Sequence, residues 1–151
     1  MEPKPPFLSV EYSKRIKRKL EDPLVKLEIV VGGIAHAFVA YTDTGCDSAL
    51  GISKETAERI GLTRTTDQVH EISLADGTVV GAYLYDVTLR INGKMFQKLI
   101  PIVDHSIKVE QPRESKGEED EEEPLLGRGI LDDFNVTFQA KSAPKKLLFE
   151  E

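Results

Sequence analysis

Hydrophobic and polar positions alternate with a period of two over much of the chain, which predicts a protein built mainly from β-strands. Residues 24–31 and 34–42 are two such runs, and Gly32 and Gly33 separate them. Glycines supply the left-handed backbone that tight turns between antiparallel strands require. These residues therefore predict a β-hairpin whose second strand ends just before Asp43.

The middle of the chain predicts a meander of at least three further strands. Strand-like runs cover 69–74, 79–91 and 95–103. The first two are separated by a turn containing Asp-Gly at 76–77, and the last two by Asn-Gly at 92–93. Both dipeptides favour the tight turns found in hairpins.

Two short helices interrupt the strands. Ser53 is a suitable N-cap for a helix that continues to about Arg59, and Gly61 just past its end is a typical C-terminal signal. A second short helix is expected over 127–134. Strands are expected over 135–141 and 145–149. With no obvious remaining partner, these two strands are candidates for a subunit interface.

The length and composition fit one globular domain. The chain has 151 residues, of which 40% are hydrophobic. The hydrophobic pattern places the domain at 24–151, after a polar N-terminal arm at 1–23 and with an acidic, mobile insertion at 104–124. The arm carries a basic run. We expect a solvated arm, and docking of the arm on a partner subunit or on the acidic insertion is the alternative.

Charge and cysteine content narrow the partners and the compartment. The net charge of −6 argues against nucleic acid as the main partner. Cys46 is the single cysteine, so no internal disulfide forms, as is usual in a reducing cytoplasm. No apolar run is long enough to span a membrane, and the N-terminus has no signal-peptide core. We therefore expect a cytoplasmic protein that does not associate with membranes.

The strongest chemical signal is Asp43-Thr44-Gly45, placed where a β-strand ends. Small polar neighbours and a glycine suit a carboxylate that must be held rigidly beside an approaching chain. The alternative is a structural turn in which the aspartate binds its own backbone.

A second motif follows at 125–131, where Leu-Leu-Gly-Arg precedes the second expected helix. Together with the Asp-Thr-Gly after an apolar strand, it resembles the retropepsin family, the single-domain aspartic proteases of clan AA. The resemblance covers about 24–149 and is nearest to the small bacterial and archaeal members. It implies an all-β fold, a closed barrel or sandwich of short antiparallel strands with one or two short helices, in a homodimer.

The resemblance also implies roles for individual residues. Asp43 is the implied catalytic residue, and Thr44 and Gly45 complete the active-site loop. A hairpin over 72–82 is the implied flap, whose substrate-binding residues are Ile72, Leu74, Asp76 and Gly77. Structural support is implied for Gly127 and for a partly buried pair between Asp47 and Arg128.

Peptide hydrolysis by carboxylates needs two of them sharing one proton, so that one activates water and the other protonates the developing oxyanion. The chain has one Asp-Thr-Gly, so the second Asp43 must come from a twofold-related copy. The expected activity is an aspartic endopeptidase acting on a peptide or protein substrate, with no cofactor and no metal.

Three departures from the family pattern bear on substrate preference and flap motion. Position 129 is Gly where retropepsins usually have Asp or Asn, the flap tip lacks a glycine-rich run, and the acidic insertion precedes Leu125.

Other functions have weaker support. A thiol mechanism would use Cys46 with a histidine base, and the candidates are His36, His70 and His105. Position 52 is Ile, so the arginine of a phosphatase loop is missing. Paired zinc-ligand spacings and a glycine-rich phosphate loop are also missing. The main alternative is a module of the same fold that binds an extended peptide without cutting it.

Overall fold

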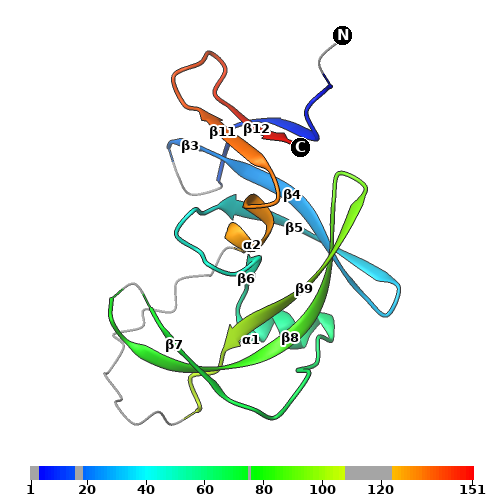
Figure 1. Ribbon diagram of the computed structural model, residues 1–151, viewed down its shortest axis with the longest axis vertical. Helices are drawn as coiled ribbons and strands as arrows, with labels where there is room; N and C mark the ends of the chain where they lie inside the picture. The colour runs from blue at the N-terminus through cyan, green and yellow to red at the C-terminus, as the bar shows by residue number, and fades with distance from the viewer. Residues whose placement is uncertain (1–3, 16–18, 75, 108–123) are drawn as a thin grey trace.

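Strands β4 (Leu24–Val31) and β5 (Ile34–Thr42) form the predicted hairpin. The computed structural model describes residues 4–15, 19–74, 76–107 and 124–151 (Figure 1). Gly32 and Gly33 turn the chain with φ of 57° and 80°, values that side chains with a Cβ rarely adopt.

The predicted meander is also present. Strands β7 (His70–Ser73), β8 (Val79–Ile91) and β9 (Lys94–Val103) pair in antiparallel order. The turn between β8 and β9 places Asn92 and Gly93 at φ of 48° and 81°. β8 is long enough to pair with β7 near its start and with β4 near its end, so it joins the two hairpins into one sheet.

The main sheet has seven strands in the order β6-β10-β5-β4-β8-β7, with β9 beside β8. β6 (Leu50–Gly51) and β10 (Leu125–Leu126) are short, and β10 is parallel to the end of β5. The prediction of a mainly β fold with two short helices is confirmed. Over the described residues the sheet does not close on itself, so the predicted closed barrel is not confirmed.

Helix α1 (Lys54–Ile60) has the caps expected from the sequence. The Ser53 hydroxyl accepts a hydrogen bond from the backbone of Thr56, and Gly61 ends the helix in the left-handed region. Helix α2 (Arg128–Leu131) is shorter than predicted, and Asp132 is its C-cap.

A second sheet joins the two ends of the chain, with the strand order β1-β12-β11. β1 (Leu8–Glu11) pairs with β12 (Lys146–Glu150), which also pairs with β11 (Asn135–Gln139) (Figure 1). A two-stranded ribbon, β2 (Ser13–Lys14) with β3 (Glu21–Asp22), follows β1. The expectation of a solvated arm therefore does not hold for Leu8–Glu11, whose backbone is part of a sheet.

Phe7 anchors this N-terminal segment. Its ring stacks on Phe134 with centroids 4.9 Å apart and meets Phe96 edge to face. The amide of Asn92 donates a hydrogen bond to the carbonyl oxygen of Phe7 over 2.6 Å. Burial of aromatic surface in such clusters stabilises a fold well beyond a single hydrogen bond.

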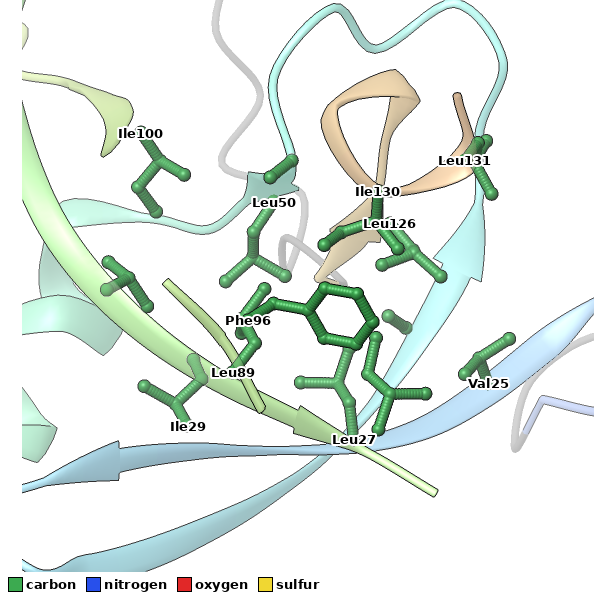
Figure 2. Packing of buried hydrophobic residues seen from close by; sticks show 14 of the residues in the cluster. Val25, Leu27, Ile29, Leu50, Leu89, Phe96, Ile100, Leu126, Ile130 and Leu131 are labelled. Carbon is green, nitrogen blue, oxygen red and sulfur yellow. The ribbon is translucent and has the colours of Figure 1, made fainter. Parts of the chain in front are cut away.

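The hydrophobic core lies between the main sheet and the segments that carry the short helices. Figure 2 shows side chains from β4, β8 and β9 facing side chains from β6, β10 and α2. Residues 108–123 of the predicted acidic insertion lie outside the described residues. Among the described helices, neither is both long and apolar enough to cross a membrane.

Candidate active site

Asp43 lies immediately after β5, where the chain leaves the sheet. Its side chain is half-buried, and Thr44 and Gly45 beside it are exposed. The backbone N–H of Gly45 donates to Oδ1 of Asp43 over 2.8 Å. The N–H of Cys46 donates to the backbone carbonyl oxygen of Asp43 over 3.2 Å. The turn thus fixes the direction of the carboxylate through its own backbone.

The loop that follows Asp43 is held by the second sequence motif through main-chain hydrogen bonds. The N–H of Asp43 donates to the carbonyl oxygen of Leu126 over 2.9 Å. In the opposite direction, three successive N–H groups of the second motif donate to carbonyl oxygens of the loop: Gly127 to Ala49 (3.0 Å), Arg128 to Cys46 (2.8 Å) and Gly129 to Ser48 (3.2 Å). The structure therefore brings together the two motifs that the sequence separates by about eighty residues.

Two glycines make this close approach possible. A Cβ at position 127 would collide with the carbonyl oxygen of Ser48 and lie 2.7 Å from that of Cys46. A Cβ at position 129 would lie 2.6 Å from the backbone nitrogen of Ala49. These are backbone atoms that cannot move aside cheaply. Gly129, a departure from the family pattern, is thus required by the packing of α2 on the loop.

The predicted pair between Arg128 and Asp47 is present but exposed. Nη1 of Arg128 lies 3.7 Å from Oδ1 of Asp47, and the two side chains are 53% and 93% exposed. Arg128 also approaches Asp132 at 3.4 Å on its own helix. The expectation of a partly buried, bidentate pair is wrong for the single chain, because the backbone rather than the guanidinium makes the contact.

The predicted flap is a regular hairpin. The N–H of Leu74 donates to the carbonyl oxygen of Thr78 over 2.8 Å, and Gly77 has φ of 83°. Ile72 and Leu74 are half-buried, whereas Asp76 and Gly77 at the turn are exposed. The substrate-binding role of these four residues remains a prediction.

The base of this hairpin is tied to α1 by Asp104. The N–H of Asp104 donates to the carbonyl oxygen of Gly81 over 2.9 Å, and Nζ of Lys54 lies 3.1 Å from its carboxylate. Ser106 donates to Oδ1 from both its hydroxyl (2.6 Å) and its backbone (2.9 Å). These bonds from Ser106, together with the Lys54 ammonium, hold the pKa of Asp104 below its usual value against the opposing effect of burial.

Cys46, the alternative nucleophile, is half-buried in the loop that follows Asp43. Its sulfur lies 3.5 Å from the Ser48 hydroxyl. Over the residues that the structure describes, no group of three or more His, Cys, Asp or Glu side chains is arranged to hold a metal ion.

One further contact near the site was not predicted from the sequence. The guanidinium of Arg15 lies 4.4 Å from the ring centroid of Tyr41, two residues before Asp43, and pairs with Asp22 at 2.6 Å. Arg15 belongs to the basic run that we expected to be solvated. Its position on an aromatic ring of β5 depends on the fold of the whole segment, which no local pattern reveals.

Comparison with known proteins gives little further information. No protein-family model and no curated protein matches this chain. Among solved structures, it is similar to the EIAV protease in complex with the inhibitor HBY-793, with 18% sequence identity and a TM-score of 0.49. The match covers 80% of this chain and 92% of that one. At this identity and score, the activity of that enzyme is not transferred to this chain.

Proposed function

We propose that the chain is an aspartic endopeptidase that is active as a homodimer. One observation carries the proposal. Asp43 is the first residue of a loop whose backbone is held by hydrogen bonds to the Leu126–Gly129 segment. Reactions that depend on a carboxylate need it held in one orientation, since a loosely held group must be reordered at every turnover. A purely structural aspartate at an exposed turn has no need of such support.

Among the described residues, the hydrogen bond from Gly45 occupies one oxygen of Asp43, Oδ1. The other oxygen can then take part in proton exchange with water. In a dimer whose twofold axis passes beside the loop, two Asp43 carboxylates would face each other and share one proton, because two adjacent carboxylates do not both ionise cheaply. The ionised partner would activate water, and the protonated one would donate to the oxygen of the scissile carbonyl.

The remaining roles follow from the resemblance and from the exposed positions of the residues. Thr44 and Gly45 line the channel between subunits, and the hairpin of β7 and β8 covers an extended peptide. The homodimer, a cytoplasmic location and a place among the small bacterial and archaeal members of the family are part of the same proposal. The half-exposed Phe138 on β11 makes the second sheet a further candidate for the dimer interface.

The test is cleavage of an unstructured protein such as casein at pH values from about 3 to 7, a range around carboxyl pKa values. Wild type would be compared with Asp43→Asn, and light scattering would give the mass of each protein. Asp86→Asn is the matched control, because Asp86 is an exposed acid on β8, away from the loop, and its carboxylate accepts hydrogen bonds from the Gln97 amide.

Cleavage that is lost in Asp43→Asn, retained in Asp86→Asn and accompanied by an unchanged dimer mass would support the proposal. Retained cleavage in Asp43→Asn would contradict it. A stable wild-type dimer that binds peptides but cuts none at any pH would instead favour the non-cleaving module. The role of Asp43 would then be structural, as the acceptor of the hydrogen bond from Gly45 in the turn.

A further inference from the structure

Among the described residues, one edge of strand β5 has no strand partner over most of its length. On one side, β5 pairs with β4 from Ile34 to Tyr41. On the other side, within the described part of the chain, only Tyr41 and Thr42 have a strand partner, in β10. Within the part of the chain that the structure describes, the backbone before Tyr41 is therefore an unpaired edge.

The hydrogen bonds at the end of β5 show which groups point to this edge. The N–H of Tyr41 donates away from β4, to Pro124 (2.9 Å), while that of Thr42 donates to Pro23 on the β4 side (3.0 Å). Backbone groups alternate in direction along a strand. Three earlier residues consequently direct their N–H and C=O groups to the open edge: Ala35, Ala37 and Val39.

Nothing in the sequence of this edge protects it from pairing. Natural edge strands usually carry charges, prolines or bulges that block another strand. Residues 34–39 contain no proline and no Asp, Glu, Lys or Arg, and Ile34 and Val39 are 63% and 48% exposed. A groove of about 430 Å³ lies against the same stretch and is lined in part by Ala37 and Phe38.

We propose that this edge pairs with β5 of a second copy of the chain, antiparallel, about a twofold axis at Ala37. Ala37 would then face Ala37 of the partner subunit, and Ala35 would face Val39 of the partner subunit. In this register, the outward N–H and C=O groups of Ala35 lie opposite those of Val39 of the partner subunit. The two strands can therefore form hydrogen bonds with each other. The structure limits the number of residues that can pair between the two copies. The Gly32-Gly33 turn ends the strand on one side, and Pro124 already occupies the backbone of Tyr41 on the other.

The side chains also suit self-pairing. On the outer face, Ala37 lies opposite Glu28 of β4, and Arg90 neutralises that glutamate with two hydrogen bonds of 2.9 and 3.0 Å. The junction thus brings small apolar groups together and keeps the charges away from it. On the inner face, His36 would meet Phe38 of the partner subunit at a position where cross-strand aromatic pairs are favourable.

Cross-linking tests the register directly. Ala37→Cys in a Cys46→Ser background should form a disulfide-linked dimer under mild oxidation, because paired strands place opposite Cα atoms about 5.5 Å apart, within disulfide range. Ala35→Cys alone should not cross-link, because its predicted neighbour is Val39. The double variant Ala35→Cys/Val39→Cys should cross-link again.

Sedimentation velocity supplies a second measurement. Ala37→Pro removes an N–H that points out of the sheet and leaves the β4–β5 ladder intact, so it should weaken association by about tenfold or more. Ala37→Val is the matched control and should associate like wild type. Circular dichroism checks that each variant is folded.

The absence of a disulfide at position 37 together with an unchanged mass for Ala37→Pro would overturn the proposal. So would loss of peptide cleavage or binding in Ala37→Pro at unchanged mass, which would assign the edge to an extended peptide. This interface is separate from the Asp43 loop and has its own twofold axis, so a chain that uses both this contact and the proposed contact at Asp43 forms an assembly larger than a dimer. Asp43→Asn should therefore leave the cross-link unchanged, whether or not that substitution abolishes cleavage.

Discussion

The backbone N–H of Arg128 lies 2.8 Å from the carbonyl oxygen of Cys46, and this main-chain bond fastens the second motif to the first. The Arg128 side chain, by contrast, extends into solvent and meets Asp47 only at 3.7 Å. The backbone conformation of the motif is therefore more important for the candidate site than its charge.

The first prediction concerns Gly127. In Gly127→Ala the added methyl group meets the backbone of Ser48 and Cys46, so the free energy of unfolding should fall by about 2 kcal/mol or more. The melting temperature should fall by about 4–8 °C, which differential scanning calorimetry measures.

Gly51→Ala is the control for this change. Its added Cβ would lie 3.2 Å from the Cβ of Leu125, a contact that a shift of a few tenths of an ångström relieves, whereas the Cβ added at position 127 meets two backbone carbonyl oxygens at much shorter distances. A Gly127→Ala protein as stable as Gly51→Ala would show that the loop does not pack on α2 as described.

The second prediction concerns Arg128. Since both carboxylates near its guanidinium are exposed, Arg128→Ala should lower stability by less than about 1 kcal/mol, the usual limit for surface ion pairs. This is smaller than the few kcal/mol that the loss of one partner of a buried pair would cost.

Urea unfolding at low and high protein concentration would check this value. A loss above about 2 kcal/mol at both concentrations would contradict the exposed geometry. A loss seen only at high concentration would mean that a dimer interface buries the pair.

The third prediction is a pH dependence that comes from Asp104. Its folded pKa is lowered chiefly by the bonds from Ser106, so its ionised form stabilises the protein. This stabilisation is complete above the unfolded pKa of about 3.9 and is lost as the pH falls through the lower folded value. Asp104→Asn should therefore cost about 2 kcal/mol at pH 7, and the difference from wild type should shrink below about pH 4.

Thermal melts from about pH 7 down to pH 2.5 would measure the effect. Asp67→Asn is the control, because the Asp67 side chain is 91% exposed. A difference between wild type and Asp104→Asn that stays constant with pH would show that the Asp104 carboxylate does not carry the stabilisation.

Much of the main sheet was predictable from the sequence. The bounds of β4, β5 and β8 agree with the alternating runs, since glycines with positive φ mark where each hairpin turns. The caps of α1 were equally clear, because Ser53 and Gly61 act through neighbouring backbone groups. Such features depend on residues only a few positions apart.

The features that the sequence did not predict depend on distant partners. The alternation of hydrophobic and polar residues shows that β12 has a buried face and an exposed face. It does not show that β1 pairs with β12. The Asp43 loop is held by hydrogen bonds to its backbone carbonyl groups, which every residue has. Only the glycines that make room for these bonds can be recognised in the sequence. The exposure of Arg128 likewise depends on how α2 sits, not on its neighbours in the chain.

The pairing of β1 with β12 has a consequence for synthesis. Leu8 lies opposite Phe149, so this pairing joins residues from two distant parts of the sequence. A growing chain exposes Phe7 and Leu8 early, long before the ribosome adds the strand that shelters them. The Asp43 loop is likewise held by Gly127–Gly129, about eighty residues further along the chain, so the candidate site can be assembled only after that later segment has been made.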